Sequence, residues 1–302
     1  MSAVQVLLDG LVDYAGLFPP ASETMRVAVE RYAEYRSGPD RGALGSFIVP
    51  VGRLAEFEVE ARELMPRGEK SEPWRLSVLV GESSPAVAEQ MLKFNCHHWS
   101  GSADGHAIID AVELKGTTAE EIEAHHRKLP TVFQRYFEVP LGESVEALVR
   151  AIARVGGRAK MRTGGITRDA FPPARDILSF LAACAKEKVA FKATAGLHHP
   201  VRGKYNLTYE AGSEAGTMYG FLNVFLAAAL LRDGESESTI LEVLEDADGR
   251  AFDFSEDAVT WRGHRVDASN LRAVRTGFAI SFGSCSFREP VHELTALVSA
   301  HA

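Results

Sequence analysis

The chain has 302 residues, of which 46% are hydrophobic and 25% are charged, a composition typical of an ordinary globular protein. Its formal net charge of −8 at pH 7 argues against nucleic acid and membrane as partners, because both call for a basic protein surface. The three cysteines are far apart and imply no disulfide framework. Because residues 1–9 show no secretory signal, we expect a cytoplasmic protein.

Short apolar runs alternate with amphipathic segments of helical length, a pattern typical of βα units and a parallel sheet. In chain order, the predicted strands are Asp13–Phe18, Ala43–Pro50, Arg75–Gly81, Ala107–Leu114, Val132–Val139, Arg158–Thr163, Val189–Thr194 and Gly277–Phe282. The predicted helices between them are Glu23–Arg36, Gly52–Met65, Pro85–Phe94, Thr118–Lys128, Glu143–Val155 and Pro173–Lys186.

This order of elements predicts an α/β fold in which residues 1–302 form one (β/α)8 TIM-barrel domain. A doubly wound open sheet is the alternative, disfavoured because no Gly-x-Gly-x-x-Gly turn follows the first strand. Residues 200–275, between the last two strands, are too many for one crossover helix. We predict that they form an insertion on the barrel rim, with a buried helix in 218–231 and a hairpin within 252–266.

Two apolar strands each carry a lysine, Lys160 in the sixth strand and Lys192 in the seventh. An unpaired ammonium is costly to bury, and two neighbouring ones lower each other's pKa, which yields a neutral amine able to form Schiff bases. The alternation of strands places Arg162 on the face of Lys160, and Thr194 on that of Lys192. If this face is the barrel interior, the cations need carboxylates or an anionic ligand; in the alternative, the lysines extend outward between helices.

Candidate carboxylates end two other strands, Glu113 in the fourth and Glu138 in the fifth. The doublet His198-His199 directly follows the seventh strand. Because function in TIM barrels sits at the C-terminal ends of the strands, we expect Glu113, Glu138 and His198 to move protons there.

The eighth strand runs into the turn Gly283–Ser286, and a helix is predicted from about Phe287. Small residues at a helix N-terminus expose backbone N–H groups that bind anions, and these barrels often hold phosphate in this place. Gly164 and Gly165 would close the other side of the site. In the alternative, the serines of the turn only cap the helix. The candidate substrate-binding residues are therefore Arg162, Thr163, Gly164, Gly165, Thr194, Gly283, Ser284, Cys285 and Ser286.

Three short motifs resemble those of deoxyribose-phosphate aldolase and its class I aldolase relatives. They are Lys160–Gly164, Lys192–Gly196 and Gly283–Ser286, in the family's order. The family has a Lys-x-x-Thr-Gly run on the sixth strand, Lys-Ala-Ser-Gly-Gly on the seventh and a phosphate-binding turn after the eighth. The resemblance implies that Lys160 is the Schiff-base nucleophile, that Lys192 lowers its pKa and that Glu113 relays protons.

The first interpretation is thus an aldolase-like lyase, acting without a cofactor on a small, anionic or phosphorylated carbonyl compound. In a second, Glu113, Glu138, His198 and His199 bind Zn²⁺, Mn²⁺ or Mg²⁺, and this metal polarises the carbonyl group in a lyase or isomerase reaction. In a third, the barrel is a non-catalytic binding or assembly protein, and the insertion, with an exposed Trp261, joins copies of the chain into a homo-oligomer.

Overall fold

The computed structural model of the protein describes residues 1–300, and its main feature is a closed barrel of eight parallel strands. In chain order these strands are β1 (Val12–Tyr14), β2 (Leu44–Pro50), β3 (Trp74–Leu79), β4 (Ala107–Lys115), β5 (Gln134–Glu138), β6 (Arg158–Arg162), β7 (Phe191–Thr194) and β13 (Ala279–Ser284). Strands that are consecutive in this series are neighbours in the barrel, and β13 pairs with β1 to close it. The predicted (β/α)8 TIM barrel is therefore confirmed.

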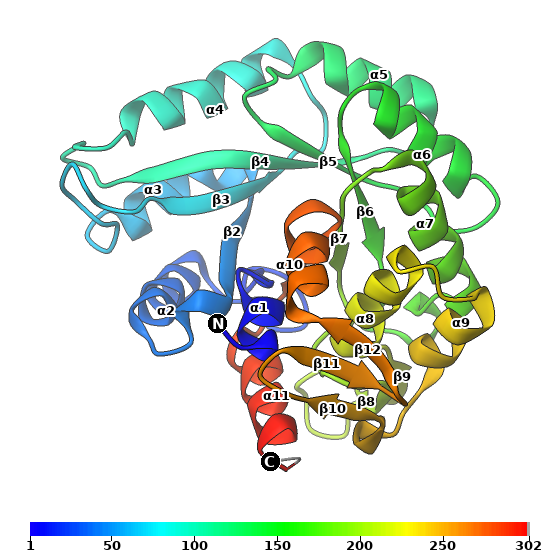
Figure 1. The fold of residues 1–302 in the computed structure, drawn as a ribbon. Helices are drawn as coiled ribbons and strands as arrows, with labels where there is room; N and C mark the ends of the chain where they lie inside the picture. The colour runs from blue at the N-terminus through cyan, green and yellow to red at the C-terminus, as the bar shows by residue number, and fades with distance from the viewer. Residues whose placement is uncertain (301–302) are drawn as a thin grey trace.

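Helices follow the strands and cover the outside of the barrel (Figure 1). They are α2 (Met25–Ser37), α3 (Leu54–Ala61), α4 (Pro85–His97), α5 (Ala119–Lys128), α6 (Val145–Arg154), α7 (Ala174–Glu187), α8 (Phe221–Arg232) and α11 (Arg288–Ala300), while α1 (Ala3–Leu8) precedes the barrel. In α6, for example, Val145, Leu148, Val149 and Ile152 are buried. This is the spacing of one helix face, so apolar periodicity explains how the helix packs on the strands.

The first strand is shorter than predicted, because it ends at Tyr14 instead of Phe18. The backbone N–H of Ala15 donates to the carbonyl of Ser284 at 2.7 Å, and Phe18 N–H donates back to the carbonyl of Ala15 at 3.0 Å. The second bond closes a turn. Ala15–Pro20 is therefore a loop at the C-terminal end of the barrel.

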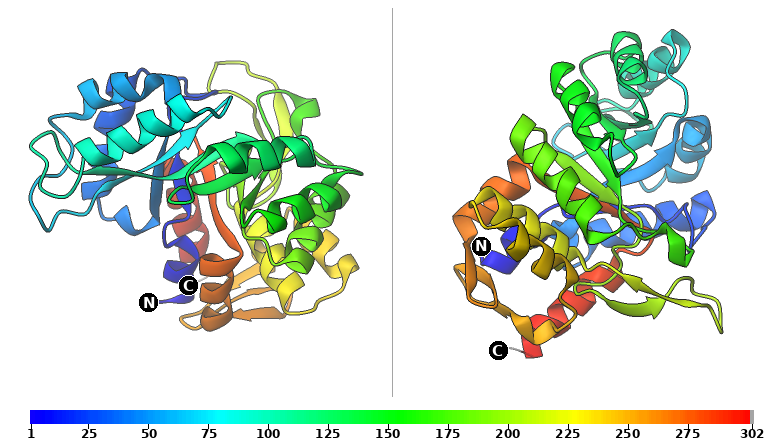
Figure 2. Two further views of the ribbon diagram at one scale, coloured as in Figure 1. Left: turned by 90° about the horizontal axis from the view of Figure 1, so that it is seen from above. Right: turned by 90° about the vertical axis from the view of Figure 1, so that its right-hand side faces the viewer.

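Residues 200–275, between β7 and β13, form two separate groups of strands and three helices. A hairpin of β8 (Gly203–Asn206) and β9 (Ala215–Met218) follows β7 and projects from the body of the molecule (Figure 2, right). The predicted apolar helix is α8, and Phe221 and Phe225 on it pack against Phe282 of the barrel. It thus serves as the outer helix between β7 and β13. Then come α9 (Glu237–Glu245) and, before β13, α10 (Ala268–Gly277).

The region 252–266, predicted as a hairpin of two strands, contains three strands. Strands β10 (Phe252–Phe254), β11 (Ala258–Trp261) and β12 (His264–Asp267) form an antiparallel sheet, with turns at residues 255–257 and 262–263. The prediction of an exposed Trp261 is wrong. Its side chain is 1% exposed and its Nε1 donates to Asp246 at 2.8 Å, so Trp261 is part of the core and offers no surface for association.

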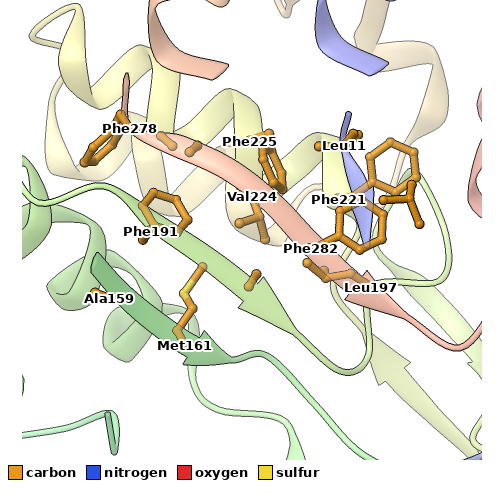
Figure 3. Close-up of a cluster of buried hydrophobic side chains, with 14 of the residues drawn as sticks. Leu11, Ala159, Met161, Phe191, Leu197, Phe221, Val224, Phe225, Phe278 and Phe282 are labelled. Atoms are coloured by element: carbon orange, nitrogen blue, oxygen red, sulfur yellow. The ribbon is translucent and has the colours of Figure 1, made fainter. Parts of the chain in front are cut away.

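The barrel strands send apolar side chains outward and polar ones inward. Phe191 on β7, Met161 on β6 and Phe282 on β13 belong to the buried layer between strands and helices (Figure 3). By alternation, Lys192, Lys160 and Ser281 then face the barrel interior. Within residues 1–300, no helix combines the length and the apolar character needed to cross a membrane.

Candidate active site at the C-terminal end of the barrel

The two lysines share one carboxylate inside the barrel. Strands β6 and β7 pair with Lys160 directly opposite Lys192, and Glu113 on β4 reaches both side chains. Its Oε2 lies 2.7 Å from the Nζ of Lys160, and its Oε1 lies 2.5 Å from the Nζ of Lys192. All three side chains are at most 4% exposed. The lysines therefore face the interior, and the alternative that they extend outward is wrong.

Each lysine also has a carboxylate of its own. Glu138 Oε2 lies 2.8 Å from Lys160 Nζ, and the same carboxylate accepts a hydrogen bond from Arg162 at 3.2 Å. Asp13 Oδ2 lies 2.7 Å from Lys192 Nζ. Three basic side chains thus meet three carboxylates, which compensates for the cost of burying the two lysines.

Sequence reasoning missed Asp13. It is 4% exposed on β1, where Ser281 Oγ donates to its Oδ2 at 2.6 Å and the backbone N–H of Ser46 donates to its Oδ1 at 2.7 Å. The signal that identified the lysines, a charged residue inside an apolar strand, was present in the sequence Val12-Asp13-Tyr14 as well.

The sequence suggested that the two lysines lower each other's pKa, but for Lys192 the structure indicates the opposite. Burial alone would lower the pKa of Lys192, but Asp13 and Glu113 outweigh it and hold that pKa above its ordinary value. Burial alone would raise the pKa of Glu113, but Lys160 and Lys192 hold it below its ordinary value. Because Glu113 lies between the two ammonium groups, Lys192 remains a cation and the interior is a network of paired charges.

A cavity of about 310 Å³ lies above this network. Lys160, Glu113 and Arg162 reach its wall, whereas Lys192 and Glu138 are not among its lining residues. The rest of the wall is mainly apolar, and its lining includes Phe18, Pro19, Pro20, Ile48, Leu79, Ile166, Leu207 and Met218. Two of the contributing segments had no assigned role from the sequence: the Ala15–Pro20 loop after β1, and the ends of the β8–β9 hairpin. Lys160 is therefore the lysine that a molecule bound in this cavity would meet.

The proposed anion-binding residues divide into two groups. Arg162, Gly165, Thr194, Gly283 and Cys285 line the cavity as expected. Thr163, Gly164, Ser284 and Ser286 are not among the lining residues and have structural partners instead. The hydroxyl of Thr163 donates to the carbonyl of Ala195 at 2.6 Å, and a Cβ added to Gly164 would come within 2.3 Å of the Phe171 ring.

The turn after β13 behaves as a helix cap. Ser286 Oγ accepts a hydrogen bond from the backbone N–H of Glu289 at 3.2 Å, and Ser284 Oγ accepts from Ser286 N–H at 3.3 Å. Burial raises the pKa of the Cys285 thiol to about 11, which disfavours the reactive thiolate. The side chain of Glu289 also stands in the first turn of α11, where its negative charge opposes a bound phosphate.

The histidine doublet contacts α11 instead of the lysine network. His198 lines the cavity, and its Nδ1 lies 3.2 Å from Glu289 Oε2. His199 Nδ1 lies 2.8 Å from Glu293 Oε2. Within residues 1–300, the groups of three ligand side chains close enough to share a metal ion include neither Glu113, Glu138 nor His198. The metal ligand set predicted from the sequence is therefore not assembled, because lysines neutralise the two glutamates and α11 holds the histidines.

Comparison with known proteins identifies no family for this chain. No protein-family model matches the chain, and no curated protein matches it. Among solved structures it is similar to a nitroalkane oxidase from Streptomyces ansochromogenes, at 14% identity and a TM-score of 0.33. The likeness covers 65% of this chain and 62% of the oxidase. The evidence on function therefore comes from the site itself.

Proposed function

We propose that the protein is a class I aldolase-type lyase in which Lys160 forms a Schiff base with a small carbonyl compound. The observation that carries the proposal is the position of Lys160. Its amine reaches the wall of a partly open, largely apolar cavity, and Glu113 and Glu138 contact it from the other side. The resemblance of the three motifs to class I aldolases supports the same assignment.

The chemistry follows from this arrangement. The ammonium group of Lys160 first gives one proton to Glu138, which contacts it. The neutral amine then attacks the carbonyl carbon, and the same proton leaves with the carbinolamine hydroxyl as water, which gives a protonated imine. This cation takes the place of the ammonium group, so the carboxylates of Glu113 and Glu138 stabilise it as well. The bond between the α and β carbons then breaks, its electrons flow into the imine to give an enamine, and a base removes the β-hydroxyl proton. Protonation of the enamine and hydrolysis release the second product and free Lys160.

His198 is the best-placed group for that base. It lines the cavity, and its Nδ1 is held by Glu289, which orients the ring and leaves its other nitrogen for proton exchange. Glu113 is less suited, because Lys160 and Lys192 hold its pKa low and thus keep it ionised. Lys192 lies behind Glu113 and acts on Lys160 through that shared carboxylate.

The cavity wall also restricts the substrate. Arg162, half exposed and paired with Glu138, offers one cation to an acidic group of the substrate, while the remaining wall is mostly apolar. Glu289 opposes a phosphate near α11. We therefore expect a carbonyl compound with one acidic group near Arg162 and an apolar remainder.

Trapping of the imine tests the proposal. The protein is incubated with a panel of aldehydes and 2-oxo acids, reduced with borohydride and weighed, and peptide mapping locates the adduct. We expect an adduct on Lys160. The variant Lys160→Arg keeps a cation between the two glutamates but forms no imine, so its adduct should be lost. Lys204→Arg, at an exposed lysine of the β8–β9 hairpin, is the matched control.

Two outcomes contradict the proposal. If the whole panel leaves the wild-type mass unchanged after reduction, the barrel acts by another route or only binds its ligand. If Lys160→Arg is labelled as strongly as the wild type, with a folded circular dichroism spectrum, the reactive amine is elsewhere.

A further inference from the structure

We propose that His199, Glu289 and Glu293 form a binding site for a divalent transition-metal ion, separate from the lysine network. One ligand atom from each of these side chains lies within 4.8 Å of the other two. An imidazole with two carboxylates is a ligand set for Zn²⁺ and related ions, and three protein ligands leave a coordination position open. The site differs from the set predicted from the sequence, which relied on Glu113 and Glu138.

The backbone places these ligands before any ion arrives. Glu289 and Glu293 are four residues apart on α11, so they lie one turn apart on the same helix face. His199 comes from the loop after β7 and its ring stacks on Tyr205, with centroids 3.5 Å apart and an interplanar angle of 13°. His199 is 8% exposed. Its Nδ1 lies 2.8 and 3.0 Å from the two carboxylate oxygens of Glu293.

A second layer of contacts holds Glu289. The hydroxyl of Tyr209, from the loop of the β8–β9 hairpin, donates to Glu289 Oε2 at 3.0 Å, and His198 Nδ1 lies 3.2 Å from the same oxygen. Partners of this kind orient the ligands in metal sites and strengthen binding.

The charges around the cluster favour a cation. Two carboxylates at this helical spacing repel each other. In the ion pairs of residues 1–300, Glu289 is matched only with His198 and Glu293 only with His199. No lysine or arginine neutralises either glutamate there. A divalent ion would match the two carboxylate charges of the cluster.

Small side-chain rotations would complete the coordination. Ligand atoms about 2.1 Å from one ion are at most about 4.2 Å apart, slightly less than the present limit of 4.8 Å. The Glu293 side chain is 42% exposed and free to adjust. An ion here would join the loop after β7 to α11, beside the cavity that His198 and Cys285 line.

A second group of possible ligands, Glu58, His97 and His98, is less suited. Both ring nitrogens of His98 already have partners, with Nδ1 at 3.0 Å from the carbonyl of Gly105 and Nε2 at 3.2 Å from Glu58. His97 is exposed and lies 3.0 Å from Asp104. This group is explained by the contacts of α4 with its neighbours.

Metal titration tests the site. The full chain, freed of metal with a chelator, is titrated with Zn²⁺ by calorimetry and with Co²⁺ by visible absorption. We expect one ion per chain. His199→Phe keeps an aromatic ring on Tyr205, and Glu293→Ala removes a half-exposed side chain, so both should fold. Each substitution removes a metal ligand and should weaken Zn²⁺ binding by more than about 10- to 100-fold. That range is the usual effect of losing a residue that only hydrogen-bonds to a ligand.

His292→Asn is the control, because it removes an imidazole from the same helix outside the cluster. It should leave the affinity unchanged. A wild-type protein that takes up no stoichiometric Zn²⁺, or an affinity that survives either ligand substitution, overturns the proposal. Borohydride trapping on Lys160 should persist in Glu293→Ala, so the outcome here is independent of the proposed lyase activity.

Discussion

The two faces of strand β7 have opposite character: one is apolar and the other is charged. Phe191, facing outward, packs against Phe180 of α7 and Phe278 with centroids 5.5 and 5.1 Å apart (Figure 3). Lys192, the next residue, faces inward and contacts Asp13 and Glu113. Both side chains are buried. The outward face gains free energy by removing apolar surface from water, while the inward face must recover the cost of burying charge.

This difference indicates which face serves stability and which serves function. Replacing a buried ion-pair network by apolar side chains of similar volume is often neutral or stabilising. The charges around Glu113 are therefore poorly explained by stability, although each of them is paired. Their position at the C-terminal end of the barrel, below a cavity, fits a role in binding or catalysis.

Glu113→Gln should have the largest effect on stability. It removes one negative charge from between two buried ammonium groups, and breaking a buried pair costs about 3–5 kcal/mol. We expect a value near the upper end, about 5 kcal/mol, because two lysines lose a partner. Urea unfolding at pH 7 measures it. A loss no greater than that of an exposed salt bridge would mean that the interior charges are well solvated.

The pH dependence of the same variant sharpens the test. The fold holds the pKa of Glu113 below its ordinary value of 4.5. Its stabilising contribution is therefore complete above pH 4.5 and is lost as the pH falls below it. The wild type should lose stability in acid more steeply than Glu113→Gln, and equal slopes would contradict the assignment.

Phe282→Ala tests the apolar, outward face of the barrel strands, here on β13. Phe282 is fully buried and stacks on Phe221 with centroids 5.3 Å apart. Truncation leaves a cavity between β13 and α8 and should lower the free energy of unfolding by about 4 kcal/mol. Because the interior network is untouched, the folded fraction should still form the Lys160 adduct. Loss of the adduct in folded protein would show that the two faces are coupled.

Ser286→Ala should have the smallest effect. The Ser286 hydroxyl accepts the N–H of Glu289 at 3.2 Å, and loss of such a cap costs about 1 kcal/mol. Thermal unfolding measures the change. Inorganic phosphate, added to wild type and variant, separates the cap from an anion site: a stabilisation by phosphate that disappears in Ser286→Ala would favour an anion site there.

The barrel was predictable because its signals are local. The alternation of strands and the helical spacing of apolar residues depend on residues close in sequence, and all eight barrel strands were located from them. The same reasoning placed Arg162 on the face of Lys160 and Thr194 on that of Lys192, and left open whether those faces are the barrel interior. It extended β1 too far: the strand ends at Tyr14, because the chain turns after it and Phe18 N–H donates to the carbonyl of Ala15.

By itself, then, the sequence determined the closed barrel and the rim on which the candidate site lies, since periodicity and strand order are properties of the chain. The structure decided that the lysines face inward. Only the tertiary structure decided how the charges pair. Asp13, from the first strand, meets Lys192, from the seventh, and α11 holds both histidines. These contacts join segments far apart in the chain, and their electrostatic energy depends on distances and burial that exist only when the barrel has closed.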